Sequence, residues 1–336
     1  MGPAPPPLFP AVSSSNLIVG AGAVYSPSVA TRDIGFMFPV AMAFHFKKSK
    51  SIAAGVRRLC RSRFNAALGR LQDCDRPSAI HAARKEIKRL RAVFRLVRRE
   101  MGRGVYRRTL RALRRAADCL AAARDAQVRL RILETLSRRS QRRFPDIRRE
   151  LRNVRRRELR RFRRRHGAAM ARRILQKAWR RVRSLELKSD GWAALEPGLR
   201  RGYCRGRQAW SRACRDPSPA RLHEWRKHVK DLAYYIPLLS LQDPSVACRQ
   251  THPLELLGKL LGQGHDLFLL QQFMAESGAG RLGEAAALRR LIAARQRRIR
   301  VAVLSRGARL YGPTPAFFCA RLKVRWVAWR GGDSAK

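Results

Sequence analysis

The sequence has 336 residues and carries 75 Lys+Arg against 23 Asp+Glu, a formal net charge of +52 at pH 7. A small domain is typically stable at a net charge of roughly 2–8, so an excess of this size repels itself unless a polyanion neutralises it. The charge disfavours a binder of neutral small molecules. The hydrophobic content of 45% excludes a disordered basic tail.

The first 41 residues differ from the rest of the sequence. They contain one Arg and one Asp, are rich in Pro, Gly and Ser, and have no periodic pattern. They also lack the basic start of a secretory signal peptide. We expect a disordered extension, or sequence upstream of the true start, with Met42 as the plausible first residue. Nowhere does the sequence approach the ~18 consecutive apolar residues of a membrane span.

The positions of the cysteines and histidines indicate the redox compartment of the protein and whether it can bind a metal ion. The seven cysteines are spaced irregularly and include no Cys-x-x-Cys pair. This pattern argues against a disulfide framework or a zinc ribbon and is typical of a reducing cytosol. Of the seven histidines only His223 and His228 are close, and a separation of five residues does not place both on one helix face. We expect a cytoplasmic protein with no metal and no cofactor.

From Phe46 onward, apolar residues recur at intervals of three and four, which is typical of amphipathic helices. No alternating strand pattern is found, so the predicted fold class is all-α. Turn-forming residues predict eight breaks, and hence about eight or nine helices. The breaks fall near 75–78, 101–104, 144–145, 189–191, 216–219, 243–253, 277–283 and 312–315.

Two motifs occur twice at nearly the same interval. DRPSAIHAARKEIKRLR at 75–91 resembles DPSPARLHEWRKHVKDLA at 216–233, with the shared skeleton H-x-x-R-K-x-x-K-x-L. LAAARDAQV at 120–128 likewise resembles LGQGHDLFL at 261–269. Asp125 follows His81 by 44 residues, and Asp266 follows His223 by 43. A period of about 140 residues is too long for a solenoid, so we infer a tandem duplication of a helical bundle.

The first copy of the His motif predicts a two-faced helix from about Ser78 to Arg99. Its apolar stripe comprises Ile80, Ala83, Ile87, Leu90, Phe94 and Val97. Its basic stripe comprises His81, Arg84, Lys85, Lys88, Arg91 and Arg95. At 100° per residue the stripes are centred roughly 100° apart, so the helix can bury one and direct the other into a cleft.

The second copy repeats this arrangement. Its apolar face comprises Leu222, Trp225, Val229, Leu232 and Ile236. Its basic face comprises His223, Arg226, Lys227 and Lys230. Like charges four residues apart destabilise a helix by a few tenths of a kcal/mol per pair, so their occurrence in both copies suggests that an anion compensates them. A solvated basic face on an amphipathic helix is the alternative.

These residue types suit phosphate. Arg donates two parallel hydrogen bonds to a phosphate group, and Lys supplies a compact charge. A histidine among cations should be neutral at pH 7, because like charge lowers its pKa, and it can still donate one hydrogen bond. A regular basic stripe requires a regular polyanion, and polyphosphate, a nucleic-acid backbone and an anionic membrane are the candidates.

At these residues the sequence resembles the CHAD family, the conserved histidine α-helical domain. The segments that carry the resemblance are IHAARKEIKRLRAVFRL, LHEWRKHVKDLAYYIPLL, AARDAQV and LGKLLGQGHDL. AFHFKKSKSIAAGVRRL is similar to a typical family start and PTPAFFCARLKVRW to its final helix, so the resemblance covers about 42–330. It implies two pseudo-symmetric bundles of about four helices each around a basic cavity. It also implies binding of inorganic polyphosphate at polyphosphate granules.

The resemblance adds Arg89 to the predicted site. The residues expected to bind polyphosphate are His81, Arg84, Lys85, Lys88, Arg89, Arg91, Arg95, His223, Arg226, Lys227 and Lys230. Asp125 and Asp266 lie beside many cations, and we expect them to hold basic residues in place by ion pairing rather than to act in catalysis.

The sequence departs from the family pattern at a few positions. Asp231 and Ala233 stand where family members commonly have basic residues, and Gln127 stands where an acidic residue is usual. An asymmetric site, dominated by the first half, is therefore expected. Many relatives also carry a triphosphatase domain with an E-x-E-x-K motif. This chain has only SLELK at 184–188, so no such domain is expected.

Residues 138–165 contain fifteen Arg and a thin apolar stripe of Ile147, Leu151, Val154 and Phe162. One interpretation is a long solvated helix that bridges the two halves. The other is an outer surface that collects phosphate or binds nucleic acid without sequence preference.

Together these features predict a domain organisation and a function. Residues 1–41 form the extension, 42–188 and 189–330 the two helical halves, and 331–336 a tail. The expected function is non-enzymatic binding of inorganic polyphosphate in the cytoplasm, in association with granules. Sequence-independent nucleic-acid binding is the alternative. An enzyme acting on phosphoanhydrides is a third hypothesis, but it needs acidic metal ligands that the sequence does not provide.

Overall fold

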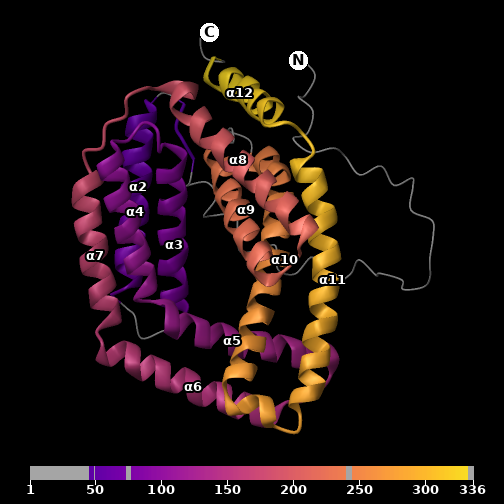
Figure 1. Ribbon diagram of the computed structural model, residues 1–336. Coiled ribbons are helices and arrows are strands. Elements are labelled where there is room, and N and C mark those ends of the chain that lie inside the picture. Colours follow the sequence, from indigo (N-terminus) through magenta and orange to yellow (C-terminus); the bar gives the residue numbers. More distant parts are fainter. Residues whose placement is uncertain (1–44, 49, 73–76, 240–243, 332–336) are drawn as a thin grey trace, which may run out of the picture.

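The computed structural model describes residues 45–48, 50–72, 77–239 and 244–331. The predicted extension 1–41, Met42 and most of the tail 331–336 lie outside these residues. The described part contains eleven α-helices, one short 3-10 helix and no strand, which confirms the all-α class (Figure 1). The helices are α2 (Ile52–Arg70), α3 (Pro77–Leu96), α4 (Arg103–Asp118), α5 (Ala121–Ser140), α6 (Pro145–Arg164), α7 (Gly167–Val182), α8 (Gly191–Arg215), α9 (Pro219–Leu239), α10 (Pro244–Glu276), η2 (Gly278–Arg281), α11 (Ala285–Tyr311) and α12 (Pro315–Gly331).

The expected count of eight or nine helices is wrong, because two breaks carry no proline signal. One lies at Cys119–Leu120, between α4 and α5. The other lies at Arg165–His166, between α6 and α7, where His166 takes a left-handed conformation with φ 48°. Glycine usually fills such a position, and here a histidine does so directly before Gly167.

The helix break predicted near 243–253 extends too far along the sequence, because α10 already begins at Pro244. Pro253 lies inside α10 and does not end a helix. A proline inside a helix removes one backbone hydrogen bond and costs about 3 kcal/mol. Leu254, Leu257 and Leu261 follow it on one face and are nearly fully buried, and α10 packs against both α9 and α11. We infer that this burial offsets the lost hydrogen bond.

The helices pack in two groups. α2, α3, α4 and α7 contact one another, and so do α8, α9, α10 and α11. α5 and α6 lie side by side and run from the first group across to the second, where α5 contacts α10 and α6 contacts η2 (Figure 1). The pseudo-symmetry of the two halves and their boundaries at 42–188 and 189–330 stay predictions.

The two groups meet along α3, which contacts both α8 and α9. At the closest point Gly198 of α8 lies against the backbone of Leu96, where an added Cβ would come within 1.7 Å of the Leu96 carbonyl oxygen. Only glycine permits this approach. The contact fixes the carboxyl end of α3 against the second group.

Both predicted apolar stripes are confirmed. All six residues of the α3 stripe are at most 1% exposed. In α9, Trp225, Val229, Leu232 and Ile236 are fully buried, and Leu222 is partly buried against the core. Each apolar stripe is buried in the core, and this fixes the direction of the basic stripe on the same helix. The two basic stripes face the junction of the two helix groups.

Candidate functional site: a basic cluster on four helices

Lys88 of α3 lies at the centre of a group of cations. The charges of Arg226 and Lys230 on α9, of Arg84 on α3 and of Arg124 on α5 all act on its amine. Desolvation and these four charges lower the pKa of Lys88 to about 7. The side chain nevertheless stays exposed to solvent. Lys88 is thus open to water and also has charged neighbours on three helices, which is typical of a side chain on a concave surface.

The two repeated Asp motifs meet at the same place. α5 carries the first motif and α10 the second, and these helices contact each other because α5 turns across the molecule after the break at Cys119–Leu120. Asp266 interacts with Arg226, Arg124 and Arg131, and with Lys88. Burial raises its pKa, whereas these four cations oppose the rise.

Asp125 plays the corresponding part in the first half. Its carboxylate interacts with Arg84 and Arg124. Burial lowers the pKa of Arg84, and Asp125 opposes that shift. Arg84 also donates a hydrogen bond to the carbonyl oxygen of Ala117, near the end of α4. Both aspartates therefore lie among basic residues, and their role in holding these residues in place stays a prediction.

Three histidines border the cations. Burial lowers the pKa of His81 to about 4, and the charges of Arg124 and Lys88 add to the shift. The rings of His223 and His265 lie 4.0 Å apart between centroids. Burial lowers the pKa of His265 to about 3, with a further contribution from His223. Burial and nearby cations also lower the pKa of His223. All three imidazoles are therefore neutral at pH 7.

The His223–His265 pair retains unused hydrogen-bonding capacity. Nδ1 of His223 is buried and has no hydrogen-bond partner among the described residues. Both rings line a small hollow of about 40 Å³ together with Leu222 and Phe268. A hollow of this size holds about one water molecule or one ligand oxygen atom.

We call the set just described the inner cluster. It comprises His81, Arg84, Lys88, Arg124, Asp125, Arg131, His223, Arg226, Lys230, His265 and Asp266. Sequence reasoning missed Arg124, Arg131 and His265. Arg124 and His265 each directly precede the Asp of the repeated motif, so the repeat already marked their positions.

Three predicted site residues already have carboxylate partners. Arg89 is buried and pairs with Glu86 at 2.7 Å, and Glu86 also pairs with Arg63 of α2 at 3.3 Å. Lys227 is exposed and pairs with Glu224 at 2.6 Å.

Arg95 is the third. It donates hydrogen bonds to both carboxylate oxygens of Asp231, at 2.7 and 2.6 Å. The structure therefore places these three residues in ion pairs rather than in the inner cluster.

The remaining two predicted residues lie beside the cluster. Lys85 interacts with Arg89, Glu86 and, across the junction, with Glu255 of α10. Arg91 lies near Arg95 and Asp231, and burial lowers its pKa to about 10. The basic stripe of α3 thus divides into a part that lies among the cations of α5 and α9 and a part that is held by a carboxylate of α9, Asp231.

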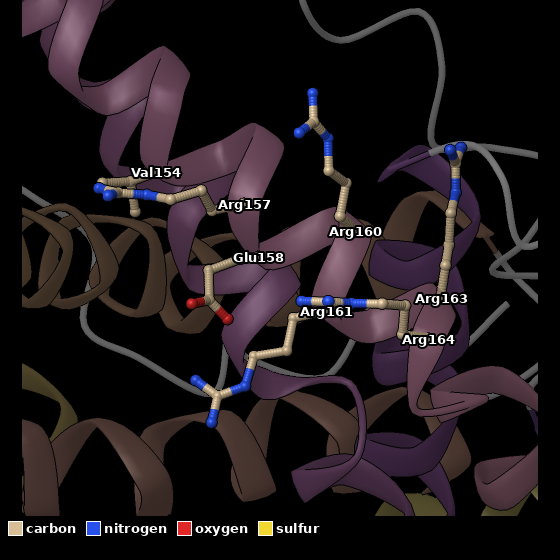
Figure 2. A pocket seen from close by; sticks show the side chains of 7 residues that line it. All are labelled: Val154, Arg157, Glu158, Arg160, Arg161, Arg163 and Arg164. Carbon is tan, nitrogen blue, oxygen red and sulfur yellow. The ribbon is translucent and has the colours of Figure 1, made fainter.

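The Arg-rich segment 138–165 is divided between the end of α5 and α6. Its thin apolar stripe is confirmed, with Ile147 and Leu151 buried and Val154 and Phe162 partly buried. Beside this stripe, side chains of α6 line an open hollow of about 800 Å³. Figure 2 shows the residues that line it, which we call the α6 surface: Val154, Arg157, Glu158, Arg160, Arg161, Arg163 and Arg164.

The part of the chain that the structure describes contains neither a metal-binding group nor a membrane-spanning helix. No three or more His, Cys, Asp and Glu side chains group together in a way that would hold a metal ion. None of the described helices combines the length and apolar character that crossing a membrane requires.

Comparison with known proteins agrees with the fold and with the motifs. The structure of PptA from Streptomyces chartreusis superposes with a TM-score of 0.56 at 18% sequence identity, covering 78% of this chain and 99% of that one. At this identity the similarity establishes the fold alone. No curated protein matches the sequence. The family model of the CHAD domain matches residues 56–275, which include both His motifs and both Asp motifs. The chain therefore belongs to the CHAD family.

Proposed function

We propose that this protein binds inorganic polyphosphate at the inner cluster and does so without cleaving it. The observation that carries the proposal is the environment of Lys88, where cations from α3, α5 and α9 converge on one solvent-accessible amine. Few carboxylates are available to balance them, chiefly Asp125, Asp266 and Glu255. A ligand with closely spaced negative charges supplies what the cluster lacks.

The chemistry of the cluster favours phosphate over other anions. The guanidinium groups of Arg84, Arg124 and Arg226 can each donate paired hydrogen bonds to one phosphate group. The neutral imidazoles donate further hydrogen bonds without adding repulsion. Along α3, the cations at 84 and 88 are about one helical turn apart, with a rise of about 6 Å between them, so a chain of phosphates can contact them in succession. Membership of the CHAD family supports the same ligand.

The test is a titration of the intact protein with long-chain polyphosphate at several salt concentrations. Affinity should fall steeply with salt, because each phosphate contact releases a counterion. A saturating ligand should also raise the Tm, because it binds only the folded state. Duplex DNA, matched in total charge, is the competitor, since nothing in the described residues favours nucleic acid over polyphosphate. Equal competition by DNA would reject the proposal.

Two parts of the proposal need separate tests. Incubation of polyphosphate with the protein and Mg²⁺ should release no inorganic phosphate above the blank, and sustained release would make it an enzyme. A fluorescent fusion should coincide with polyphosphate granules in the cytoplasm. A fusion carrying Lys88→Glu should lose that coincidence while keeping the same abundance.

A further inference from the structure

The α6 surface contains cations that no group in the described residues neutralises. α6 has ten Arg and only three acidic residues in its 20 positions. Two of the acids are used within the helix, where Asp146 pairs with Arg149 and Glu150 with Arg157. Among the described residues, no ion pair or hydrogen bond engages the side chains of Arg160, Arg161 or Arg164, and all three residues are exposed.

These arginines repel one another. Arg157 and Arg161, and likewise Arg160 and Arg164, are four residues apart on one helix, a spacing that destabilises the helix when the charges are alike. They surround the open hollow of about 800 Å³ in Figure 2, and Glu158 is its one acidic lining residue. The arrangement is open to solvent and leaves room for an extended anion to lie along the helix.

Helix α6 contacts α5, which carries part of the inner cluster. Arg124 and Arg131 of α5 act on His81 and Asp266, so this stripe of α5 belongs to the inner cluster. Gln127 lies on the same stripe, and its side-chain oxygen accepts a hydrogen bond from Arg155 of α6 at 3.3 Å. The neutral amide holds Arg155 in place without cancelling its charge. Arg155 therefore places one cation of α6 next to the inner cluster. It does not line the hollow and lies on the opposite face of α6 from Arg157 and Arg164, so a phosphate chain must pass around α6 to reach the α6 surface.

We propose that the α6 surface is a second contact site for the same polyphosphate chain, which long chains reach after filling the inner cluster. This inference rests on the proposed function and assigns a chain-length dependence to it. Short chains should engage the inner cluster only, whereas long chains should gain affinity from the arginines of α6.

The experiment compares two ligands and three proteins. The ligands are tripolyphosphate and long-chain polyphosphate. The proteins are the native chain, the triple variant Arg160→Gln, Arg161→Gln, Arg164→Gln, and a matched control on α4, Arg107→Gln, Arg108→Gln, Arg111→Gln, which removes three exposed arginines elsewhere. Glutamine has nearly the same helix propensity as arginine, so both variants should keep their helicity, which circular dichroism verifies.

We expect the α6 variant to bind tripolyphosphate as the native protein does and to bind long-chain polyphosphate about tenfold more weakly. Its salt dependence should fall by roughly two in slope, since three phosphate contacts are lost. The α4 control should retain the native values with both ligands.

Other outcomes overturn the inference in distinct ways. An unchanged affinity of the α6 variant for long chains, or an equal loss in the α4 control, would mean that the α6 surface is not a specific contact. Displacement of long-chain polyphosphate from it by charge-matched DNA would assign it to nucleic acid instead. Failure of the native protein to bind either phosphate ligand would reject the proposed function itself, which the tripolyphosphate titration reveals separately.

Discussion

The inner cluster and the α6 surface are both strongly basic, but they are built differently. The inner cluster gathers side chains from α3, α5, α9 and α10, and its cations are partly desolvated and interact with two aspartates. The α6 surface comes from one helix and faces solvent. Convergence of several helices gives a site a defined shape, whereas a single helix gives a row of charges. The first arrangement should select its ligand, and the second should mainly add affinity for a long one.

The largest effect should come from reversing charge at the centre of the inner cluster. The double variant Arg84→Glu, Lys88→Glu replaces two cations with two anions where basic side chains of α3, α5 and α9 meet. Hydrogen bonds to charged groups contribute about 1.5–3 kcal/mol each, so polyphosphate affinity should fall by roughly a hundredfold or more. Isothermal titration calorimetry at fixed salt measures the change.

A matched charge reversal on α4, Arg107→Glu with Arg111→Glu, is the control for bulk charge. It should lower the affinity only a few-fold, because both residues are exposed and lie on α4, which contributes no residue to the inner cluster. Lys88→Gln alone serves if the double variant unfolds, since Arg84 also donates a hydrogen bond to Ala117. Comparable losses in the α4 variant and the inner variant would erase the distinction between the two regions.

The pH dependence should sharpen the comparison further. The pKa values of His81 and His265 are about 4 and 3, below the ordinary value near 6.5. The unfolded chain therefore takes up protons that the ligand-free folded protein does not. The free energy of unfolding of the ligand-free protein should thus fall as the pH falls from about 6.5 towards 4. A bound polyanion favours the protonated imidazoles and raises their pKa.

Two measurements check this coupling. Polyphosphate should bind about tenfold more tightly at pH 5.5 than at pH 7.5, with proton uptake visible as a buffer-dependent binding enthalpy. The rise in Tm on adding polyphosphate should likewise be larger at pH 5.5. Lys88, with a pKa of about 7, also takes up protons on binding near pH 7.5 but is already protonated at pH 5.5. At pH 5.5, substituting Gln for His81, His223 and His265 should therefore remove most of the proton uptake, and a triple variant that still takes up the native number of protons at that pH would contradict this assignment.

The smallest effect concerns the part of the α3 stripe held by Asp231. Burial opposes ionisation of Arg95, but Asp231 outweighs it and raises the pKa of Arg95. Asp231→Asn should lower the free energy of unfolding by about 1–3 kcal/mol, because it leaves Arg95 without its charged partner. The same change should tighten polyphosphate binding a few-fold by freeing Arg95 for the ligand. If Asp231→Asn binds no more tightly than Asp231→Asn with Arg95→Gln, then Arg95 does not reach the ligand.

Helix periodicity predicts much of this fold. The apolar stripe of α3 repeats without interruption through Ile80, Ile87 and Phe94, and all three are buried as expected. The breaks at Cys119–Leu120 and Arg165–His166 were missed because a change of direction without proline leaves little local signal. His166 adopts a left-handed conformation although it is not a glycine, which a local pattern does not reveal.

The site was predicted as two stripes, whereas the structure brings four helices together. Arg124 and His265 were recognised as part of a repeated motif but not as site residues, because their meeting depends on α5 turning towards α10. Arg89 has the right residue type and position in the motif, yet Glu86, which also pairs with Arg63 of α2, holds it in a buried ion pair. Tertiary contacts of this kind decide which basic residues remain available to a ligand.

The most direct test of the central claim is competition between long-chain polyphosphate and charge-matched duplex DNA for the intact protein at near-physiological salt. The selective shape of the inner cluster predicts that polyphosphate stays bound and raises the Tm while DNA at equal charge displaces little of it. Equal displacement by DNA, together with an unchanged affinity in the Arg84→Glu, Lys88→Glu variant, would show that net charge alone accounts for the binding.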